Sequence, residues 1–303
     1  MIQYYTIEDR KIVVSEPERA VVFLILNPTE EERKTLIGRE HLDEHTLQSA
    51  LDPDEISRIE FETDHVALIV KKPKSYSSDD MFKFQVSSMG IFLFDNKILI
   101  VSDTDIPFAA EKRFAKITSL KSLLLKLLGY CIYHFMEHLR IINQISDDLE
   151  NKINQSMENK YLIFMFSLSK GLVYYLNAIN SNGMLLQRLT NTQKIQLNEL
   201  EKEMVEDLSI DNSQCYRIAE IYSNILSSMM DARASIVSNN LNILMKTLNI
   251  ITIAIMVPTF VVSAFSMNVP IPFSGLGYAF YGILLLAAIS VAGFFAFWRY
   301  KKW

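Results

Sequence analysis

Polar side chains recur at helical spacing in the C-terminal third of the sequence, within a segment otherwise rich in Ile, Val, Leu and Phe. Alternate steps of four and three residues from Asp231 lead along one seam of a helix. Nine of the eleven positions in this seam are polar. We call the set the polar stripe, and its members are Asp231, Ser235, Ser238, Asn242, Met245, Asn249, Thr252, Met256, Thr259, Ser263 and Ser266.

The polar stripe carries groups that could line a path for a cation. Polar side chains that face lipid are costly, so the stripe should face other helices or water. For any single Ser or Thr, close helix packing is the simpler interpretation. The register of the whole stripe favours a pore in which several copies of one helix surround an axis. Neutral oxygen ligands suit a hard cation such as Mg²⁺, which gives up its water reluctantly.

Two residues of this helix could control such a pore. Asp231 would add a ring of carboxylates at the cytoplasmic mouth. Leu248 lies just beside the stripe and could form a hydrophobic gate.

The elements that must position the stripe follow from the charge pattern. The chain has no Asp, Glu, Lys or Arg from Thr247 to Trp298. A Pro/Gly-rich turn at 269–277 divides this stretch into two helices of about 20 residues, each about 30 Å long. We therefore expect transmembrane helices at about 247–267 and 278–298, joined by an extracytoplasmic loop at 269–277. A buried helical hairpin of a soluble protein is the alternative.

Positive charges predict the orientation of these helices. Lys246 precedes the first helix, a basic tail at 299–303 follows the second, and the loop between them has no Lys or Arg. The positive-inside rule then puts both termini in the cytoplasm of a protein in the plasma membrane. The N-terminus lacks the apolar run of a signal peptide, which agrees with a cytoplasmic N-terminal part.

The remaining sequence predicts an α/β domain over 1–110. Apolar, β-branched runs at 21–26, 65–70 and 97–101 have the length of strands. A capping box formed by Thr29 and Glu32 predicts the start of a helix.

Long helices are expected after this domain. A helical hairpin region at 111–198 contains helices at 120–157 and 161–189. A stalk helix at 199–268 continues into the first membrane span. If continuous, the stalk is about 90 Å long, and it needs packing partners because such a helix is not stable alone.

Other features narrow the function class. The net charge of −5 argues against nucleic acid as a partner. The sequence shows no Gly-rich phosphate-binding loop, so nucleotide binding has no support. Cys131 and Cys215 are far apart and predict neither a disulfide nor a zinc site. His134 and His138 stand in an H-x-x-E-H pattern, which is also the inverted zinc-peptidase motif. Such a pattern arises easily by chance, and we do not expect an enzyme.

Several segments resemble the CorA family of magnesium and cobalt transporters, which includes ZntB-like zinc transporters. The similar segments are Asn242 to Lys246, Met256 to Phe260, Ser266-Met267-Asn268 and Lys301-Lys302-Trp303. The resemblance implies an α/β cytoplasmic domain, a long-helix stalk and two C-terminal transmembrane helices, assembled as a funnel-shaped homopentamer. It implies transport of divalent metal ions, chiefly Mg²⁺, with Co²⁺, Ni²⁺ or Zn²⁺ as alternatives.

The resemblance also assigns residues. Ser266, Met267 and Asn268 would form the selectivity filter, with an Asn268 ring holding a hydrated cation at the outer mouth. Asn242, Leu248, Met256 and Thr259 fall on pore-lining positions of the family. Asp207 matches one member of a regulatory metal-binding pair.

Three departures from the family pattern bear on the ion that is carried. Ser266 replaces the signature Gly, and the outer loop lacks the usual acidic residue. The expected partner of Asp207 is Ser49, although Asp52, Asp54 and Glu55 are near in sequence. These departures leave a ZntB-type zinc transporter open. A membrane-anchored scaffold or sensor without transport is a further alternative.

Overall fold

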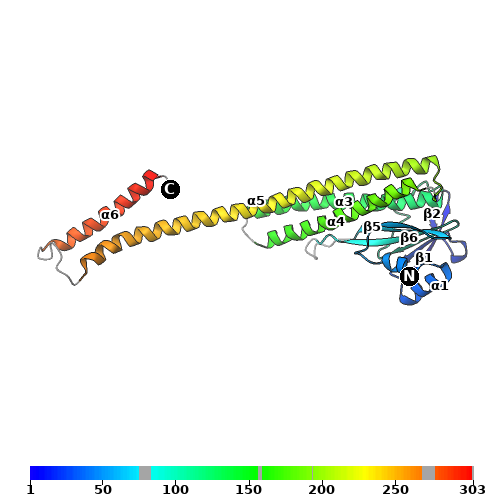
Figure 1. Ribbon diagram of the computed structural model, residues 1–303, viewed down its shortest axis with the longest axis horizontal. Helices are drawn as coiled ribbons and strands as arrows, with labels where there is room; N and C mark the ends of the chain where they lie inside the picture. Colours follow the sequence, from blue (N-terminus) through cyan, green and yellow to red (C-terminus); the bar gives the residue numbers. More distant parts are fainter. Residues whose placement is uncertain (75–82, 156–158, 193, 268–276, 302–303) are drawn as a thin grey trace. The chain divides into compact units, whose positions relative to one another are not determined.

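The computed structural model describes residues 1–74, 83–155, 159–192, 194–267 and 277–301 (Figure 1). The chain forms two compact units, Met1–Met230 and Asp231–Trp303. The first unit contains a sheet with helices on both faces. The second contains the end of one long helix and a further C-terminal helix.

The sheet of the first unit has seven strands in the order β2-β1-β3-β7-β6-β5-β4. Only β3 and β7 pair in parallel, and the other neighbours are antiparallel. The sequence predicted β3, β5 and β7, and all three are confirmed. The strands are β1 (Ile2–Glu8), β2 (Lys11–Val14), β3 (Val22–Leu26), β4 (Arg58–Phe61), β5 (His65–Pro73), β6 (Val86–Phe94) and β7 (Ile98–Ser102).

Two short helices, α1 (Glu30–Glu40) and α2 (Glu44–Ser49), cover one face of the sheet. The predicted capping box of α1 is present: the Thr29 hydroxyl accepts from the backbone N–H of Glu32, and the Glu32 carboxylate accepts from that of Thr29. Helix α2 packs very close to β6. A Cβ atom on Gly90 would collide with that of Ala50, so glycine is required at this contact.

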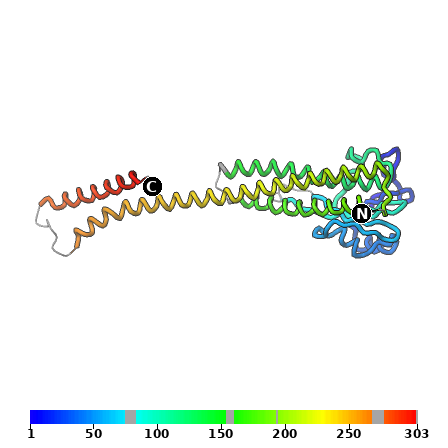
Figure 2. Tube along the Cα trace, turned by 45° about the horizontal axis from the view of Figure 1, so that its top comes forward, coloured from blue at the N-terminus to red at the C-terminus, as the bar shows by residue number. Residues whose placement is uncertain are grey.

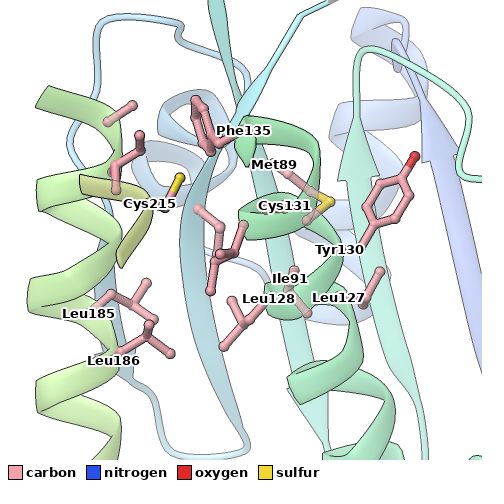
Figure 3. Packing of buried hydrophobic residues seen from close by; sticks show 14 of the residues in the cluster. Met89, Ile91, Leu127, Leu128, Tyr130, Cys131, Phe135, Leu185, Leu186 and Cys215 are labelled. Carbon is pink, nitrogen blue, oxygen red and sulfur yellow. The ribbon is translucent and has the colours of Figure 1, made fainter. Parts of the chain in front are cut away.

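Helices α3 (Leu120–Gln155) and α4 (Asn159–Asn191) pack on the opposite face, together with the beginning of α5 (Glu199–Phe265). Figure 2 shows these three helices side by side. Apolar side chains fill the space between them and the sheet, and Figure 3 shows Cys131 and Phe135 of α3 next to Met89 of β6. Cys131 and Cys215 are both free and buried, and burial raises the pKa of each thiol to about 12.

The long helices predicted from the sequence are confirmed. Helix α5 is continuous over 67 residues, corresponding to about 100 Å, and includes Pro258. The last helix is α6 (Ala279–Lys301). Two 3₁₀ turns, Pro17–Arg19 and Lys112–Phe114, complete the described elements. The α/β fold with a long helix and C-terminal helices agrees with the predicted fold class.

Candidate ion pathway and its surroundings

Every member of the polar stripe is exposed in the single chain. All of them lie on α5 except Ser266, which follows the helix in a turn. The gate candidate Leu248 is 61% exposed. Packing within the chain therefore leaves this face of α5 free to meet water, lipid or another protein surface.

The hydroxyl groups of the stripe have a common hydrogen-bonding pattern. The hydroxyls of Thr252 and Thr259 donate to the carbonyls of Leu248 and Ile255, one turn earlier, at 2.8 and 2.7 Å. The hydroxyl of Ser266 donates to the carbonyl of Ser263 at 2.9 Å. Because these protons are used by the backbone, the oxygen lone pairs remain as acceptors. Such an oxygen can contact a metal ion or its bound water.

Large apolar side chains flank the stripe and are exposed as well. Ile255 and Phe260, for example, are 62% and 76% exposed. The apolar window of α5 is not buried at all within the chain. A surface of this kind requires a bilayer, other copies of the chain, or both.

Length and composition qualify three of the described helices as candidate membrane spans, in the ranges Lys160–Asn191, Glu199–Phe265 and Ala279–Lys301. The sequence predicted only the last two. The additional candidate, α4, is 39% buried in its apolar window. The side chain of its Asn182 is also hydrogen-bonded to the backbone N–H and C=O of Lys71 in β5, at 3.0 and 2.9 Å. Helix α4 is thus attached to the sheet.

A cavity of about 600 Å³ lies between the C-terminal part of α5 and α6. Three stripe residues, Asn242, Met245 and Asn249, contribute to its wall. Sequence reasoning assigned no site residue to α6. The cluster of Trp298 with basic residues at the end of the chain was the signal available for this cavity.

The surroundings of the proposed regulatory site are only partly acidic. Asp207 is exposed on α5, whereas Ser49 is buried and donates to the Glu55 carboxylate at 2.9 Å. That carboxylate is also paired with Arg58 at 2.7 Å. The described residues contain no group of three or more His, Cys, Asp or Glu side chains placed to hold a metal ion. Glu55 is therefore a poor replacement for the missing partner of Asp207 in the single chain.

A lysine further neutralises this acidic loop. The Lys71 ammonium donates to the carbonyl of Pro53 at 2.7 Å and to the hydroxyl of Ser88 at 2.9 Å. Burial lowers the pKa of Lys71, although the nearby carboxylates of Asp52 and Asp54 act in the opposite direction.

The H-x-x-E-H pattern lies on α3, against the sheet. The His138 ring is within 2.7 Å of the Tyr175 hydroxyl, and burial lowers the His138 pKa to about 4. Burial also lowers the pKa of His134. Neutral imidazoles are the form that binds metal, but the Nδ1 atom of His138 is engaged by tyrosine. This arrangement fits a packed core contact.

The predicted filter lies only partly within the described residues. Ser266 and Met267 are exposed, and Met267 is 59% exposed. Asn268 and the loop that follows it lie outside the described residues. The role assigned to Asn268 remains a prediction.

Comparison with known proteins gives matches over most of the chain. Residues 20–301 match the family described as CorA-like Mg2+ transporter protein. The cobalt/magnesium transport protein CorA of Methanocaldococcus jannaschii is 25% identical over 289 residues, covering 91% of this chain and 89% of that protein.

Solved structures share the fold. The complete structure of the CorA magnesium transporter from Methanocaldococcus jannaschii has a TM-score of 0.84 at 21% identity, covering 98% of this chain and 96% of that one. The cytoplasmic domain of ZntB from Vibrio parahaemolyticus has a TM-score of 0.60 at 13% identity, covering 78% of this chain and 98% of that one. Because the family match extends over nearly the whole sequence, the chain belongs to the CorA-like Mg²⁺ transporter family of divalent-cation transporters.

Proposed function

We propose that this chain forms a homopentamer in the plasma membrane and conducts Mg²⁺ into the cytoplasm through an axial pore lined by the polar stripe. The observation that carries the proposal is the exposure of the whole stripe along one face of α5. Family membership supports transport of a divalent cation. Co²⁺ and Ni²⁺ are expected as additional substrates.

In the proposed topology, the end of α5 and all of α6 cross the bilayer, and both termini are cytoplasmic. The apolar windows of these helices are 0% and 6% buried, compared with 39% for α4. The hydrogen bonds of Asn182 to β5 are a further reason to keep α4 outside the membrane. The basic residues next to the spans, Lys246, Arg299 and Lys301, favour the cytoplasmic side for these ends.

The membrane potential is a sufficient driving force for this mechanism. It supplies about 2.3 kcal/mol per charge for each 100 mV, and hence about 4.6 kcal/mol for a divalent ion. Asn268 would hold the hydrated ion at the outer mouth, supported by Ser266 and Met267. The hydroxyl oxygens of Thr252 and Thr259 would then contact its water shell. No nucleotide is needed.

Leu248 and Met245 would close the pathway, since a ring of apolar side chains can stop ions by excluding water. The ring of Asp231 carboxylates would concentrate cations at the cytoplasmic mouth. Metal bound at Asp207 would stabilise the closed assembly, with its partner in the loop that follows Ser49. In that loop Asp52 and Asp54 are better candidates than Glu55, which is paired with Arg58.

Zinc transport is the second candidate, because the first unit shares its fold with a ZntB cytoplasmic domain and Ser266 stands where the CorA signature has Gly. A scaffold or sensor without transport is the third.

Ion flux into liposomes reconstituted with the purified protein separates the three candidates, with Mg²⁺, Co²⁺, Ni²⁺ and Zn²⁺ tested in parallel. We expect Mg²⁺ flux that is lost in Asn268→Ala. Flux of Zn²⁺ alone would favour the second candidate, and absence of all flux would favour the third. Undiminished Mg²⁺ flux through Asn268→Ala would contradict the proposed role of that residue.

A further inference from the structure

The cavity between α5 and α6 has a polar end formed by three side chains. Lys246 and Lys301 both line it, and Trp298 lies in the same wall. Among the residues that the structure describes, neither ammonium group has an ion-pair partner. The described lining also contains no acidic side chain. The cavity therefore favours a negatively charged group.

The indole N–H of Trp298 is a second and independent sign of a missing ligand. Its Nε1 atom is buried and has no hydrogen-bond partner among the described residues. A buried donor without an acceptor costs about 1–3 kcal/mol. An acceptor oxygen within the cavity would remove this cost once the ring rotates to bring the N–H into the cavity.

Apart from the amides of Asn242 and Asn249, the rest of the wall is apolar. Ile250 and Ile253 of α5 line the cavity together with Phe294 and Phe297 of α6. A volume of about 600 Å³ is within the range of small-ligand sites. The combination of two cations, one N–H donor and a largely apolar wall matches an amphiphile with an anionic head.

We propose that this cavity binds an anionic phospholipid of the cytoplasmic leaflet. Lys246 and Lys301 bind the phosphate, and the N–H of Trp298 donates to a phosphate or ester oxygen. The acyl chains lie along Phe294 and Phe297. The site rests on the proposed two-span topology, which puts its basic end at the membrane surface where anionic headgroups are found.

The position of the site gives the lipid a route to the pore. Asn242, Met245 and Asn249 belong both to the polar stripe and to the wall of this cavity. Binding there would fix the rotation of α5 about its axis at the level of the gate. The lipid is thus expected to alter flux without contacting the transported ion.

The two tryptophans of the chain, Trp298 and Trp303, make the proposal directly measurable. In a Trp303→Phe background, Trp298 is the sole tryptophan, and brominated lipids quench its fluorescence on contact. The full-length protein is reconstituted in vesicles of phosphatidylcholine containing phosphatidylglycerol, with either lipid brominated at equal mole fraction. We expect stronger quenching by brominated phosphatidylglycerol.

Substitutions of lysines that line the cavity test whether the preference for phosphatidylglycerol arises there. Lys246→Gln and Lys301→Gln should each lower it by about five-fold, as expected for one lysine near an anionic surface. Lys→Arg substitutions at both positions should retain it. Arg299→Gln is the matched control, because Arg299 is at the same level of α6 but does not line the cavity. If Lys246→Gln does not assemble, Lys301→Gln at the end of α6 serves alone.

Four results would overturn the proposal. Equal quenching by the two lipids would mean no headgroup preference, and no quenching by either would mean that a neighbouring copy fills the cavity. An equal loss in Arg299→Gln would indicate diffuse surface charge. Removal of the preference by inorganic phosphate would indicate a site for the free anion. None of these results depends on ion flux, so the proposed transport activity is tested separately.

Discussion

Asn182 is expected to make one of the largest single side-chain contributions to the stability of the first unit. Strand β4 pairs with β5 only as far as Ile69, so the outward backbone groups of Lys71 have no strand beside them. The Asn182 amide takes that place: its oxygen accepts from the N–H of Lys71 at 3.0 Å, and its NH₂ donates to the carbonyl of Lys71 at 2.9 Å. The same oxygen accepts from the Ser57 hydroxyl at 2.7 Å.

Asn182→Ala would leave three buried groups without these partners. Asn182 is only 4% exposed, so water cannot replace the amide without entering the core. At about 1 kcal/mol for each lost bond, the free energy of unfolding should fall by about 3 kcal/mol. For a unit of this size, the loss corresponds to a decrease of about 6–12 °C in the unfolding temperature.

The assay is thermal unfolding of the full chain in detergent, followed by circular dichroism. Tryptophan fluorescence is unsuitable because Trp298 and Trp303 are both outside the first unit. Asn180→Ala is the matched control, since Asn180 is exposed on the same helix. A change of less than about 0.5 kcal/mol in Asn182→Ala would refute this interpretation of the α4–β5 contact.

Three further changes test the pathway and the core. Leu248→Asn should raise the resting Mg²⁺ flux in liposomes, because a polar ring is wetted more easily than an apolar one; unchanged flux would remove Leu248 from the gate. Asp231→Asn should lower flux several-fold at low ionic strength and much less at 0.5 M salt. The reason is screening, because the Debye length falls from about 10 Å at 0.1 M to 3 Å at 1 M. Equal losses of flux at the two salt concentrations would argue against an electrostatic role. His138 has its pKa lowered from 6.5 to about 4 in the folded state, so the unfolded state binds the proton first. Stability should therefore fall as pH decreases from 6.5 towards 4, by up to about 1.4 kcal/mol per pH unit, and His138→Phe should reduce this slope in denaturant titrations.

Local sequence patterns were sufficient for α1, for the long helices and for three strands, whereas α2 was not predicted. The capping box of Thr29 and Glu32 predicts the start of α1 because the bonds are made within one turn. Strands β3, β5 and β7 are buried apolar runs whose composition alone indicates a strand.

The other strands depend on partners that are distant in sequence. Strand β6 begins with Val-Ser-Ser-Met-Gly, a weak strand pattern, and forms because β5 and β7 pair with it on both sides. Strand β1 is half-exposed along its length and has no continuous apolar run. The role of Asn182 likewise rests on Lys71, which is 111 positions away. Such contacts follow from tertiary packing and leave little trace in local periodicity.

The same distinction applies to the candidate site. The polar stripe is a property of one helix, and its register could be found from spacing alone. The cavity lined by Lys246, Trp298 and Lys301 requires α5 and α6 to meet, so the cluster of Trp298 with basic residues was not enough to predict it. The assignment of Asn268 came from the family resemblance and not from spacing.

The chemistry of the stripe bears on the proposed choice of ion. Direct ligation by nitrogen or sulfur would hold Zn²⁺, Co²⁺ and Ni²⁺ more tightly than Mg²⁺, because affinity rises towards the end of the first transition series. The stripe contains neither His nor Cys, and its Met245 and Met256 thioethers are soft, uncharged ligands. Hydroxyl and amide oxygens can instead contact an intact water shell. Mg²⁺ gives up its water reluctantly, so we expect that a pore of this composition would pass Mg²⁺ without having to strip its shell.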